Sequence, residues 1–441
     1  MNSNYLNKSI KLNDLERKKI QKKRHVNDKI LNIVRQFIID KKLVCYGGTA
    51  INDILPKEQQ FYNYETDIPD YDFFSPNAME DAKELANLFT KENVHNIESK
   101  NAFIYGTYKV FVNFVAIADI TQIDKKFYEY LLKNNIQKDK VMYTPPEFLR
   151  MSLHQELARP LGDISRWEKI YSRLRILNNY FPILTKNKLK TYYEDKLDLT
   201  NSEMKEVYQQ LFDHFRKKNM VFCNFDITIR LMHKYMKIGL KYKKDFTDIF
   251  IVYTDNLPKA IRELKDKNIE GLELKKVKSV YKFVNNYCYL YFKGKVVGIV
   301  FATNSCLAYN IVKHKRREIR LGNIDTLLNL YFTLLLINDI PLNRNMIKEV
   351  IDKLQYVVAH YKEILEQYEH ISAIPEKLKR FNLPCYGKQE DKEDVLKERT
   401  SKYKKYSKNK TSKEFKKLFF KYSPRIKQKT RKKNRQKYSS N

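Results

Sequence analysis

The sequence LVCYGGTA at residues 43–50 is an apolar run that ends in a glycine pair. Further along the chain stand DYDFFSP at residues 70–76 and VAIADIT at residues 115–121. Each of these apolar runs predicts a strand, and the polar or glycine residues beside it mark where the strand ends. The three stretches therefore predict, in order, a strand into a glycine turn, a strand with two aspartates, and a strand with a third.

The two aspartates of the second stretch are spaced for metal binding. Asp70 and Asp72 are two residues apart, and side chains two apart on a strand project from the same face. Carboxylates held side by side repel each other unless a cation lies between them. Their oxygen atoms suit Mg²⁺ or Mn²⁺, and Asp119 on the later strand would complete the ligand set. We therefore predict a two-metal site for phosphoryl transfer, with Asp70, Asp72 and Asp119 as ligands.

The glycine pair predicts a phosphate-binding turn. Gly47 and Gly48 lie between a predicted strand and a predicted helix, where glycine lets backbone N–H groups approach a phosphate. We expect Gly47, Gly48 and Thr49 to bind the triphosphate of a nucleotide. Taken singly, a glycine turn, an Asp-x-Asp pair and a strand-end aspartate are more often plain structural features. Only the ordered set is specific.

This ordered set resembles the nucleotidyltransferases of the DNA-polymerase-β type, whose pattern is hG[GS], then hDhDh, then hDh. More narrowly, DIPDYDFFSP at residues 67–76 and ADIT at residues 118–121 resemble the viral poly(A) polymerases of poxviruses, giant viruses and asfarvirus-like viruses. The segment ELARPLGDISRWEK at residues 156–169 is similar to the same group. The resemblance extends over residues 43–180 and weakens beyond them.

The resemblance implies an α+β fold: a polymerase-β-like nucleotidyltransferase catalytic domain, followed by a degenerate nucleotidyltransferase-like domain with added helices. It implies a template-independent enzyme that adds AMP from ATP to single-stranded RNA 3′ ends and releases pyrophosphate. It further implies a homodimer, or else a processivity subunit as partner, in the host cytoplasm or packaged in the virion. Only the resemblance indicates that the added nucleotide is an adenine nucleotide. A uridylyl- or CCA-adding enzyme, or a non-enzymatic RNA-binding protein with this fold, is the alternative.

A predicted helix over residues 165–179 carries four cations, Arg166, Lys169, Arg173 and Arg175. They form either a solvated helix face or a set of contacts to the triphosphate or to RNA. The family resemblance favours Lys169 as a triphosphate ligand.

Composition indicates an anionic partner. The chain of 441 residues has a net charge of +33, which favours nucleic acid first and an anionic membrane surface second. Its apolar runs are far shorter than the roughly 20 residues that span a bilayer, so we expect no membrane partner. Five cysteines are scattered without a Cys-x-x-Cys pair. We expect reduced core cysteines, neither disulfides nor zinc ligands.

The second half resembles a decayed copy of the first. The alignment puts unrelated residues where the first half has its glycines and two of its aspartates: Phe225 and Asp226 for the glycine pair, Phe250 for Asp72 and Phe301 for Asp119. Only Asp248 keeps a carboxylate. Because one carboxylate is a poor metal site, we predict that this half is catalytically inactive. Chance similarity between two αβ segments is the alternative.

Four regions follow from these patterns. We predict an N-terminal helical region at 1–42, a catalytic domain at 43–190, a degenerate domain at 191–395 and a basic, flexible tail at 396–441. From Ser401 onward the tail holds 17 lysines and arginines against one acid, Glu414, with aromatic residues between them. We expect the tail to be disordered alone and to bind RNA. A solubility or nuclear-targeting tail is the alternative.

Overall fold

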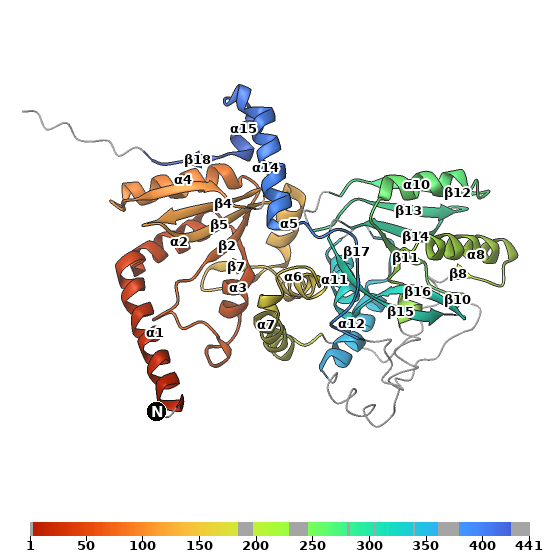
Figure 1. Ribbon diagram of the computed structural model, residues 1–441, viewed down its shortest axis with the longest axis horizontal. Helices are drawn as coiled ribbons and strands as arrows, with labels where there is room; N and C mark the ends of the chain where they lie inside the picture. Colours follow the sequence, from red (N-terminus) through yellow and green to blue (C-terminus); the bar gives the residue numbers. More distant parts are fainter. Residues whose placement is uncertain are drawn as a thin grey trace, which may run out of the picture.

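The structure is a computed structural model that describes residues 3–103, 105–183, 197–228, 246–279, 283–303, 305–314, 316–337, 340–359 and 379–424. Two mixed β-sheets, each with helices beside it, flank a central group of helices (Figure 1). Within the described ranges, none of the helices has the length and hydrophobicity that a membrane span requires.

The first sheet has the strand order β18-β3-β4-β5-β2-β1-β7-β6. Its strands are β1 (Val44–Tyr46), β2 (Tyr71–Ser75), β3 (Ile97–Asn101), β4 (Thr107–Val112), β5 (Val115–Gln122), β6 (Ile136–Lys138), β7 (Val141–Tyr143) and β18 (Lys421–Tyr422). The helices of this half are α1 (Ser3–His25), α2 (Asp28–Asp40), α3 (Gly47–Ile54), the 3₁₀ turn η1 (Lys57–Gln59), α4 (Ala78–Lys91) and α5 (Lys125–Asn134).

Helical spacing of apolar residues explains how these helices cover the sheet. In α2, the Asn27 side chain accepts a hydrogen bond from Ile30 N and so caps the helix. One face of α2 buries Ile30, Val34, Phe37 and Ile38, as the sequence period predicts. Helix α4 buries Leu85 and Phe89 in the same core.

The second sheet has the strand order β12-β13-β14-β11-β9-β16-β15-β17. Its strands are β9 (Val221–Phe222), β11 (Phe250–Thr254), β12 (Leu272–Val277), β13 (Tyr287–Phe292), β14 (Lys295–Ala302), β15 (Leu307–His314), β16 (Arg317–Gly322) and β17 (Cys385–Tyr386). Helices α8 (Ser202–Lys217) and α10 (Leu257–Asp266) belong to this half, and β8 (Leu197–Asp198) pairs with β10 (Phe246–Thr247).

The two sheets repeat one pattern. The strand order β3-β4-β5-β2-β1-β7-β6 in the first sheet corresponds strand by strand to the order β12-β13-β14-β11-β9-β16-β15 in the second. The same two neighbouring pairs are parallel in each sheet. They are β2–β5 and β1–β7 in the first sheet, and β11–β14 and β9–β16 in the second. Even an irregularity recurs: the register shifts after Val110 in β4 and after Leu290 in β13. We infer that the second half is a structural repeat of the first, while the domain boundaries drawn from the sequence stay a prediction.

The two register shifts, here called bulges, correct the residue alignment made from the sequence. Before each bulge, Val110 pairs with Ala118 and Leu290 pairs with Gly298, so the next residues, Asp119 and Ile299, are equivalent. Asp119 in turn pairs with Asp72, and Ile299 pairs with Ile251. Counting two residues back makes Ile249 the equivalent of Asp70.

Four sequence-based equivalences are therefore wrong. Phe250 and Phe301 do not occupy the positions of Asp72 and Asp119, and Asp248 does not occupy the position of Asp70. Asn224 and Phe225, one residue earlier than expected, correspond to the glycine pair, since β9 pairs with β11 as β1 pairs with β2. Short apolar strands align almost equally well when slipped by one or two residues, and only hydrogen-bonded pairing fixes the register.

Helices α6 (Pro146–Leu157) and α11 (Ile324–Leu336) follow the equivalent strands β7 and β16 and pack against each other at the centre of the molecule (Figure 1). The ring of His154 stacks on that of Phe332 at 5.9 Å, and Asn329 Nδ2 donates to Met151 O at 2.9 Å. When residues are counted from the equivalent strands β7 and β16, His154 corresponds to Phe332 and Met151 corresponds to Asn329. Equivalent residues meet only near a two-fold axis, so the halves are related by an approximate two-fold at this contact.

The remaining central elements are the 3₁₀ turn η2 (Ile164–Arg166), α7 (Trp167–Tyr180) and α12 (Arg344–Ala359). After β17 the chain returns to the first half as α14 (Lys392–Tyr406), the 3₁₀ turn η4 (Ser407–Asn409), α15 (Lys413–Leu418) and β18.

The predicted flexible tail is wrong for residues 396–424. Phe420 is buried against Tyr108, with ring centroids 5.3 Å apart, and β18 extends the first sheet at β3. Apolar burial and edge pairing together hold a segment that composition alone predicts to be disordered. Residues 425–441 of that prediction lie outside the described residues.

The prediction of unpaired cysteines is wrong for one pair. Cys306 and Cys385 form a disulfide across 79 residues, with their Cα atoms 5.2 Å apart. The pairing of β15 with β17 brings these two cysteines together, which their sequence spacing does not reveal. Cys45, Cys223 and Cys288 are free and buried, as expected.

Candidate active site

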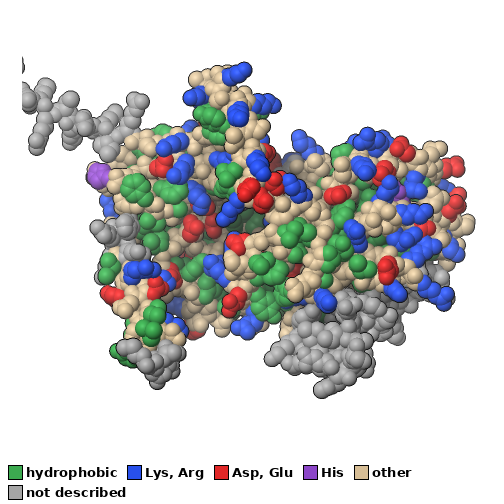
Figure 2. Space-filling view, in the orientation of Figure 1, with side chains coloured by type: hydrophobic (Ala, Val, Ile, Leu, Met, Phe, Trp, Pro, Cys, Tyr) green, Lys and Arg blue, Asp and Glu red, His purple; other side chains and the backbone are tan. Residues whose placement is uncertain are grey.

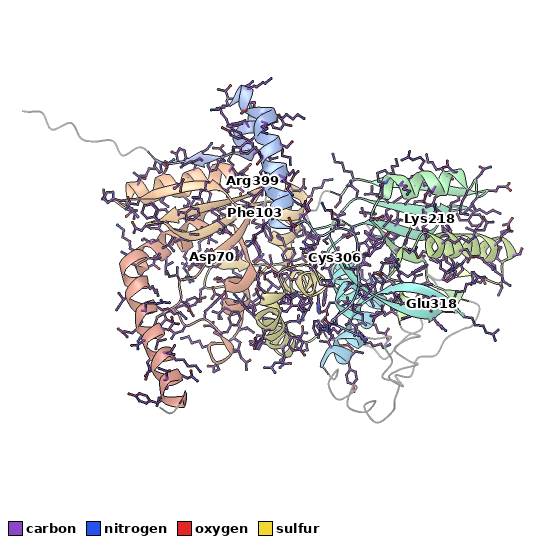
Figure 3. The ribbon with its side chains drawn as sticks, in the orientation of Figure 1. Asp70, Phe103, Lys218, Cys306, Glu318 and Arg399 are labelled. Atoms are coloured by element: carbon purple, nitrogen blue, oxygen red, sulfur yellow. A yellow bond between two sulfur atoms is a disulfide. The ribbon has the colours of Figure 1, made fainter. Side chains whose placement is uncertain are left out.

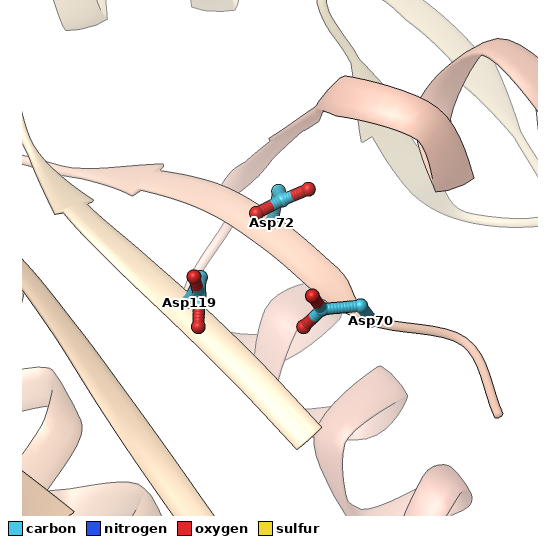
Figure 4. A group of neighbouring side chains, drawn as sticks. All are labelled: Asp70, Asp72 and Asp119. Atoms are coloured by element: carbon cyan, nitrogen blue, oxygen red, sulfur yellow. The ribbon is translucent and has the colours of Figure 1, made fainter. Parts of the chain in front are cut away.

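Three carboxylates converge on one face of the first sheet (Figure 4). Asp70 immediately precedes β2, Asp72 lies within β2, and Asp119 lies opposite Asp72 on the neighbouring parallel strand β5. One oxygen atom of each carboxylate lies within 4.8 Å of the others. The structure thus brings together the residues that the sequence predicts as metal ligands.

The electrostatics of this group fit a divalent cation. Burial, followed by the charge of Asp119, raises the pKa of Asp70. Burial and the charges of Asp70 and Asp119 raise the pKa of Asp72 well above its usual range. Asp119 Oδ1 is buried and has no hydrogen-bond partner among the described residues. Crowded carboxylates with an unpartnered buried oxygen are stabilised by a bound cation, so these residues fit Mg²⁺ or Mn²⁺.

Lys109 belongs to the site and was missed from the sequence. It lies on β4 opposite Asp119, and its Nζ donates to Asp119 Oδ2 at 2.5 Å. Burial lowers the pKa of Lys109, but the hydrogen bond and charge of Asp119 outweigh it, so the net pKa is raised. The alternation of β4 could have placed Lys109 on the face opposite Tyr108 and Val110, although it does not reveal Asp119 as the partner.

A chain of hydroxyl groups supports the strands around the carboxylates. Tyr46 Oη and Thr121 Oγ1 are 2.8 Å apart, and Thr107 Oγ1 lies 2.9 Å from Thr121 Oγ1. The ring of Tyr46 also stacks on Phe74 at 4.0 Å. These contacts fix β1, β2, β4 and β5 relative to one another at the candidate site.

The glycine turn approaches both the carboxylates and a cation. Gly47 has φ +78°, and a Cβ there would lie 2.4 Å from Asp72 Oδ2. A Cβ on Gly48 would lie 2.7 Å from Arg173 Nη1. The positive φ and the close approach favour glycine at position 47, and a side chain at position 48 would displace the guanidinium of Arg173. Thr49 donates through Oγ1 to Asp70 O at 2.8 Å, so its hydroxyl positions the aspartate strand.

The four cations of the 165–179 helix separate in the structure. Arg173 is buried at the glycine turn, where its Nη2 donates to Tyr62 Oη at 2.6 Å and its guanidinium lies over the Phe61 ring at 4.6 Å. Lys169 is exposed, and partial desolvation by its neighbours, followed by the charges of Arg173 and Arg166, lowers its pKa. Arg166 forms an ion pair with Glu156 at 3.2 Å, and Arg175 is exposed. Arg173, which the sequence did not distinguish, is the cation beside Gly48.

Comparison with known proteins now adds to this geometry. Residues 32–163 match the family model of the poly(A) polymerase catalytic subunit. This match confirms the resemblance to viral poly(A) polymerases over the stretch that carries the carboxylates and the glycine turn. A poly(A) polymerase catalytic subunit of African swine fever virus (Tick/Malawi isolate) is 31% identical over 187 residues, which are 40% of this chain and 39% of the relative.

In another relative, too, the match covers only part of the chain. The mimivirus protein of the same name, from Acanthamoeba polyphaga mimivirus, is 32% identical over 157 residues, or 34% of this chain and 26% of that protein. The chain thus spans about two fifths of the length of the African swine fever virus relatives it matches.

The fold likeness extends further than the sequence likeness. The crystal structure of the Megavirus polyadenylate synthase matches with a TM-score of 0.75, covering 96% of this chain and 86% of that chain at 19% identity. The predicted α+β fold class is confirmed.

Proposed function

We propose that this chain is a template-independent poly(A) polymerase that transfers AMP from ATP to the 3′ end of single-stranded RNA. The observation that carries the proposal is the convergence of Asp70, Asp72 and Asp119 beside the turn of Gly47 and Gly48. The family match over residues 32–163 and the names of the viral relatives support adenylate as the transferred group.

The reaction forms one bond and breaks one. The 3′-oxygen of the RNA attacks the α-phosphorus of ATP, and the bond from that phosphorus to the oxygen bridging to the β-phosphate breaks, so pyrophosphate leaves. Asp119 accepts the proton of the 3′-hydroxyl as general base. Two divalent cations held by Asp70, Asp72 and Asp119 would supply electrophilic stabilisation of the attacking and leaving oxygens.

Other residues of the site position the nucleotide. Gly47 and Gly48 leave room for phosphate oxygens at the N-terminus of α3. Arg173, fixed by Tyr62 beside Gly48, binds the triphosphate, and Lys169 adds a second cation from the same helix. Lys109 orients the Asp119 carboxylate through its hydrogen bond.

Primer extension tests this function. Purified protein is mixed with labelled single-stranded RNA, Mg²⁺ or Mn²⁺, and each nucleoside triphosphate separately, with Asp72→Ala as control. We expect an extension ladder with ATP that is absent in the variant. A ladder with another nucleotide would keep nucleotidyl transfer and change the base choice. Failure of the wild-type protein with every nucleotide and both metals would favour either a missing partner subunit or a non-enzymatic RNA-binding protein.

The assembly and location are proposed on the family resemblance. We expect a homodimer in preference to a complex with a processivity subunit, in the host cytoplasm or packaged in the virion. Light scattering of the purified chain tests the dimer, since a monomeric mass at micromolar concentration would favour a separate processivity subunit.

A further inference from the structure

Residues 392–424 form a folded unit, here called the C-terminal lobe, which consists of α14, η4, α15 and β18. It projects from the first sheet (Figure 1). Strand β18 pairs with β3, and Tyr422 Oη donates to Asn87 Oδ1 at 2.6 Å. The Phe420 side chain is buried in the core of the first half. The lobe therefore has a fixed place on the half that carries the carboxylates.

The surface of this lobe is charged with one sign. Residues 402–424 contain nine lysines and one acid, Glu414. Seven of these lysines are exposed and have no carboxylate partner among the described residues: Lys404, Lys405, Lys408, Lys410, Lys413, Lys416 and Lys417. Blue side chains surround the projecting part in Figure 2. Unpaired cations held this close repel one another, and a polyanion that binds them removes the repulsion and releases its counterions.

An exposed ring lies among these cations. Tyr403 is 45% exposed, and its ring is held by Phe419 at 5.3 Å and Phe415 at 5.8 Å. A fixed aromatic face beside lysines is suited to a single-stranded nucleic acid, whose bases stack while its phosphates contact the cations. An acidic protein or an anionic membrane would not need the ring.

The lobe also contacts the loop that leads into the active-site strands. Arg399 Nη1 donates to Ala102 O at 2.8 Å and to Phe103 O at 3.0 Å, and Figure 3 shows Arg399 close to Phe103. Lys402 Nζ lies 4.2 Å from the centre of the Tyr105 ring. Strand β4 begins two residues after Tyr105 and carries Lys109, the partner of Asp119. A strand bound on the lobe is thus held in a fixed relation to the carboxylates.

We propose that the C-terminal lobe is the surface that holds the RNA strand behind its 3′ end, with the lysines on the phosphates and Tyr403 under a base. The identity of the ligand as the RNA substrate rests on the proposed function. The lobe supplies affinity, and the carboxylate site supplies the chemistry.

Matched charge-removal variants test the lobe in the full-length chain. One variant carries Lys404→Gln, Lys405→Gln, Lys408→Gln and Lys410→Gln. The control removes four exposed lysines from α10, β12 and the turn between them, with Lys259→Gln, Lys265→Gln, Lys267→Gln and Lys275→Gln. Fluorescence anisotropy then measures the affinity for a labelled 20-nucleotide single-stranded RNA, without nucleotide, at several salt concentrations.

We expect the lobe variant to lose about tenfold or more in affinity at 150 mM salt, and its slope of log affinity against log salt to fall by about 2 to 3, because each phosphate contact contributes about 0.7 for single strands. The control should change either value little. Equal losses in both variants, or no loss in the lobe variant, would overturn the proposal. A tighter, equally lysine-dependent affinity for vesicles of anionic lipid would overturn it as well.

A second measurement needs no variant. Crosslinking of a 4-thiouridine-substituted RNA to the wild-type protein should label residues 392–424, and labels confined to other segments would overturn the proposal. Primer extension at saturating RNA separates the two hypotheses. The lobe variant should keep the wild-type maximal rate while needing more RNA to reach it. If no nucleotide is added but RNA still crosslinks to the lobe, the proposed function fails and the RNA surface stands.

Discussion

The two halves use one sheet pattern for opposite purposes. At equivalent positions the first half has Asp70, Asp72 and Asp119, and the second has Ile249, Ile251 and Ile299, each at most 5% exposed. Burying a large aliphatic side chain stabilises a fold by about 1.5–3 kcal/mol, whereas crowding carboxylates opposes folding. The first half therefore gives up stability where it gains a cluster of carboxylates, and the second half keeps that stability.

The turns differ in the same way. Gly47 leaves a gap at the start of α3, while its equivalent Asn224 fills the position with a side chain. Asn224 Nδ2 donates to Ile249 O and its Oδ1 accepts from Ile251 N, both at 3.3 Å. A turn that is open at Gly47 in one half is closed by strand-to-turn hydrogen bonds of Asn224 in the other. The comparison teaches that the repeat conserves the frame, while a few side chains decide whether the frame carries a site.

The largest expected effect separates the carboxylates of the two halves. Asp72→Asn should lower AMP addition by roughly 10³-fold or more, because metal ligation contributes several kcal/mol to the transition state. Asp248→Asn, at a buried carboxylate of the second half, should leave the rate per folded molecule unchanged while lowering the melting temperature. Initial rates normalised to folded protein test both. Comparable loss of rate in the two variants would break the distinction between the halves.

The next prediction contrasts a glycine whose substitution should lower the rate with one whose substitution should lower only the stability. Gly47→Ala should lower kcat/KM by about 10²-fold, since its Cβ would displace Asp72 by roughly an ångström. Gly298→Ala in the second half would bring a Cβ to 3.0 Å from Leu290 Cδ1, so it should cost about 1–3 kcal/mol of stability with little change in rate. Steady-state kinetics and urea unfolding distinguish the two outcomes. A purely thermodynamic effect of Gly47→Ala would argue against the phosphate turn.

A third effect concerns the contact between the halves. Arg380 donates to Asp325 through Nε at 2.7 Å and Nη2 at 2.8 Å, and all three groups of the cluster, with His154, are buried. Asp325→Asn should destabilise the protein by about 3–5 kcal/mol, because it removes the carboxylate charge that pairs with a buried guanidinium. Urea unfolding at neutral pH measures this change, with Asp213→Asn of α8, a partly exposed carboxylate paired with Arg317, as control for charge removal.

The same carboxylate predicts a pH dependence. Burial raises the pKa of Asp325, but the charge and hydrogen bonds of Arg380, with those of His154, outweigh it and hold the pKa below the usual range. A depressed pKa contributes stability above the unfolded value of about 3.9 and loses it as the pH falls below that value. Wild-type protein should therefore lose more stability than Asp325→Asn below about pH 4. Parallel loss in both proteins would remove Asp325 from the explanation.

A smaller loss of stability than that of Asp325→Asn is expected at strand β17, which is added to the edge of the second sheet. Replacing Cys306 and Cys385 by alanine together should lower stability by about 2–4 kcal/mol, because the disulfide closes a loop of 79 residues. The rate of AMP addition should stay unchanged, because the disulfide lies at the edge of the second sheet. The corresponding edge addition of the first sheet, β18 on β3, contains no cysteine. Thermal unfolding with and without reductant tests this, and a loss of rate on reduction would show that the second sheet edge matters to the site.

The sequence by itself determined the order of the motifs and the three carboxylates, because strand period and glycine turns are local properties that survive in one dimension. The fold class came from the resemblance of these motifs to a known family. The sequence also indicated a repeat. Tertiary structure alone decided the register of that repeat, since slipped alignments of apolar strands look alike until the pairing is seen. Lys109, Arg173, the Cys306–Cys385 disulfide and the folded C-terminal lobe likewise depend on contacts between segments far apart in the chain, which no local pattern encodes.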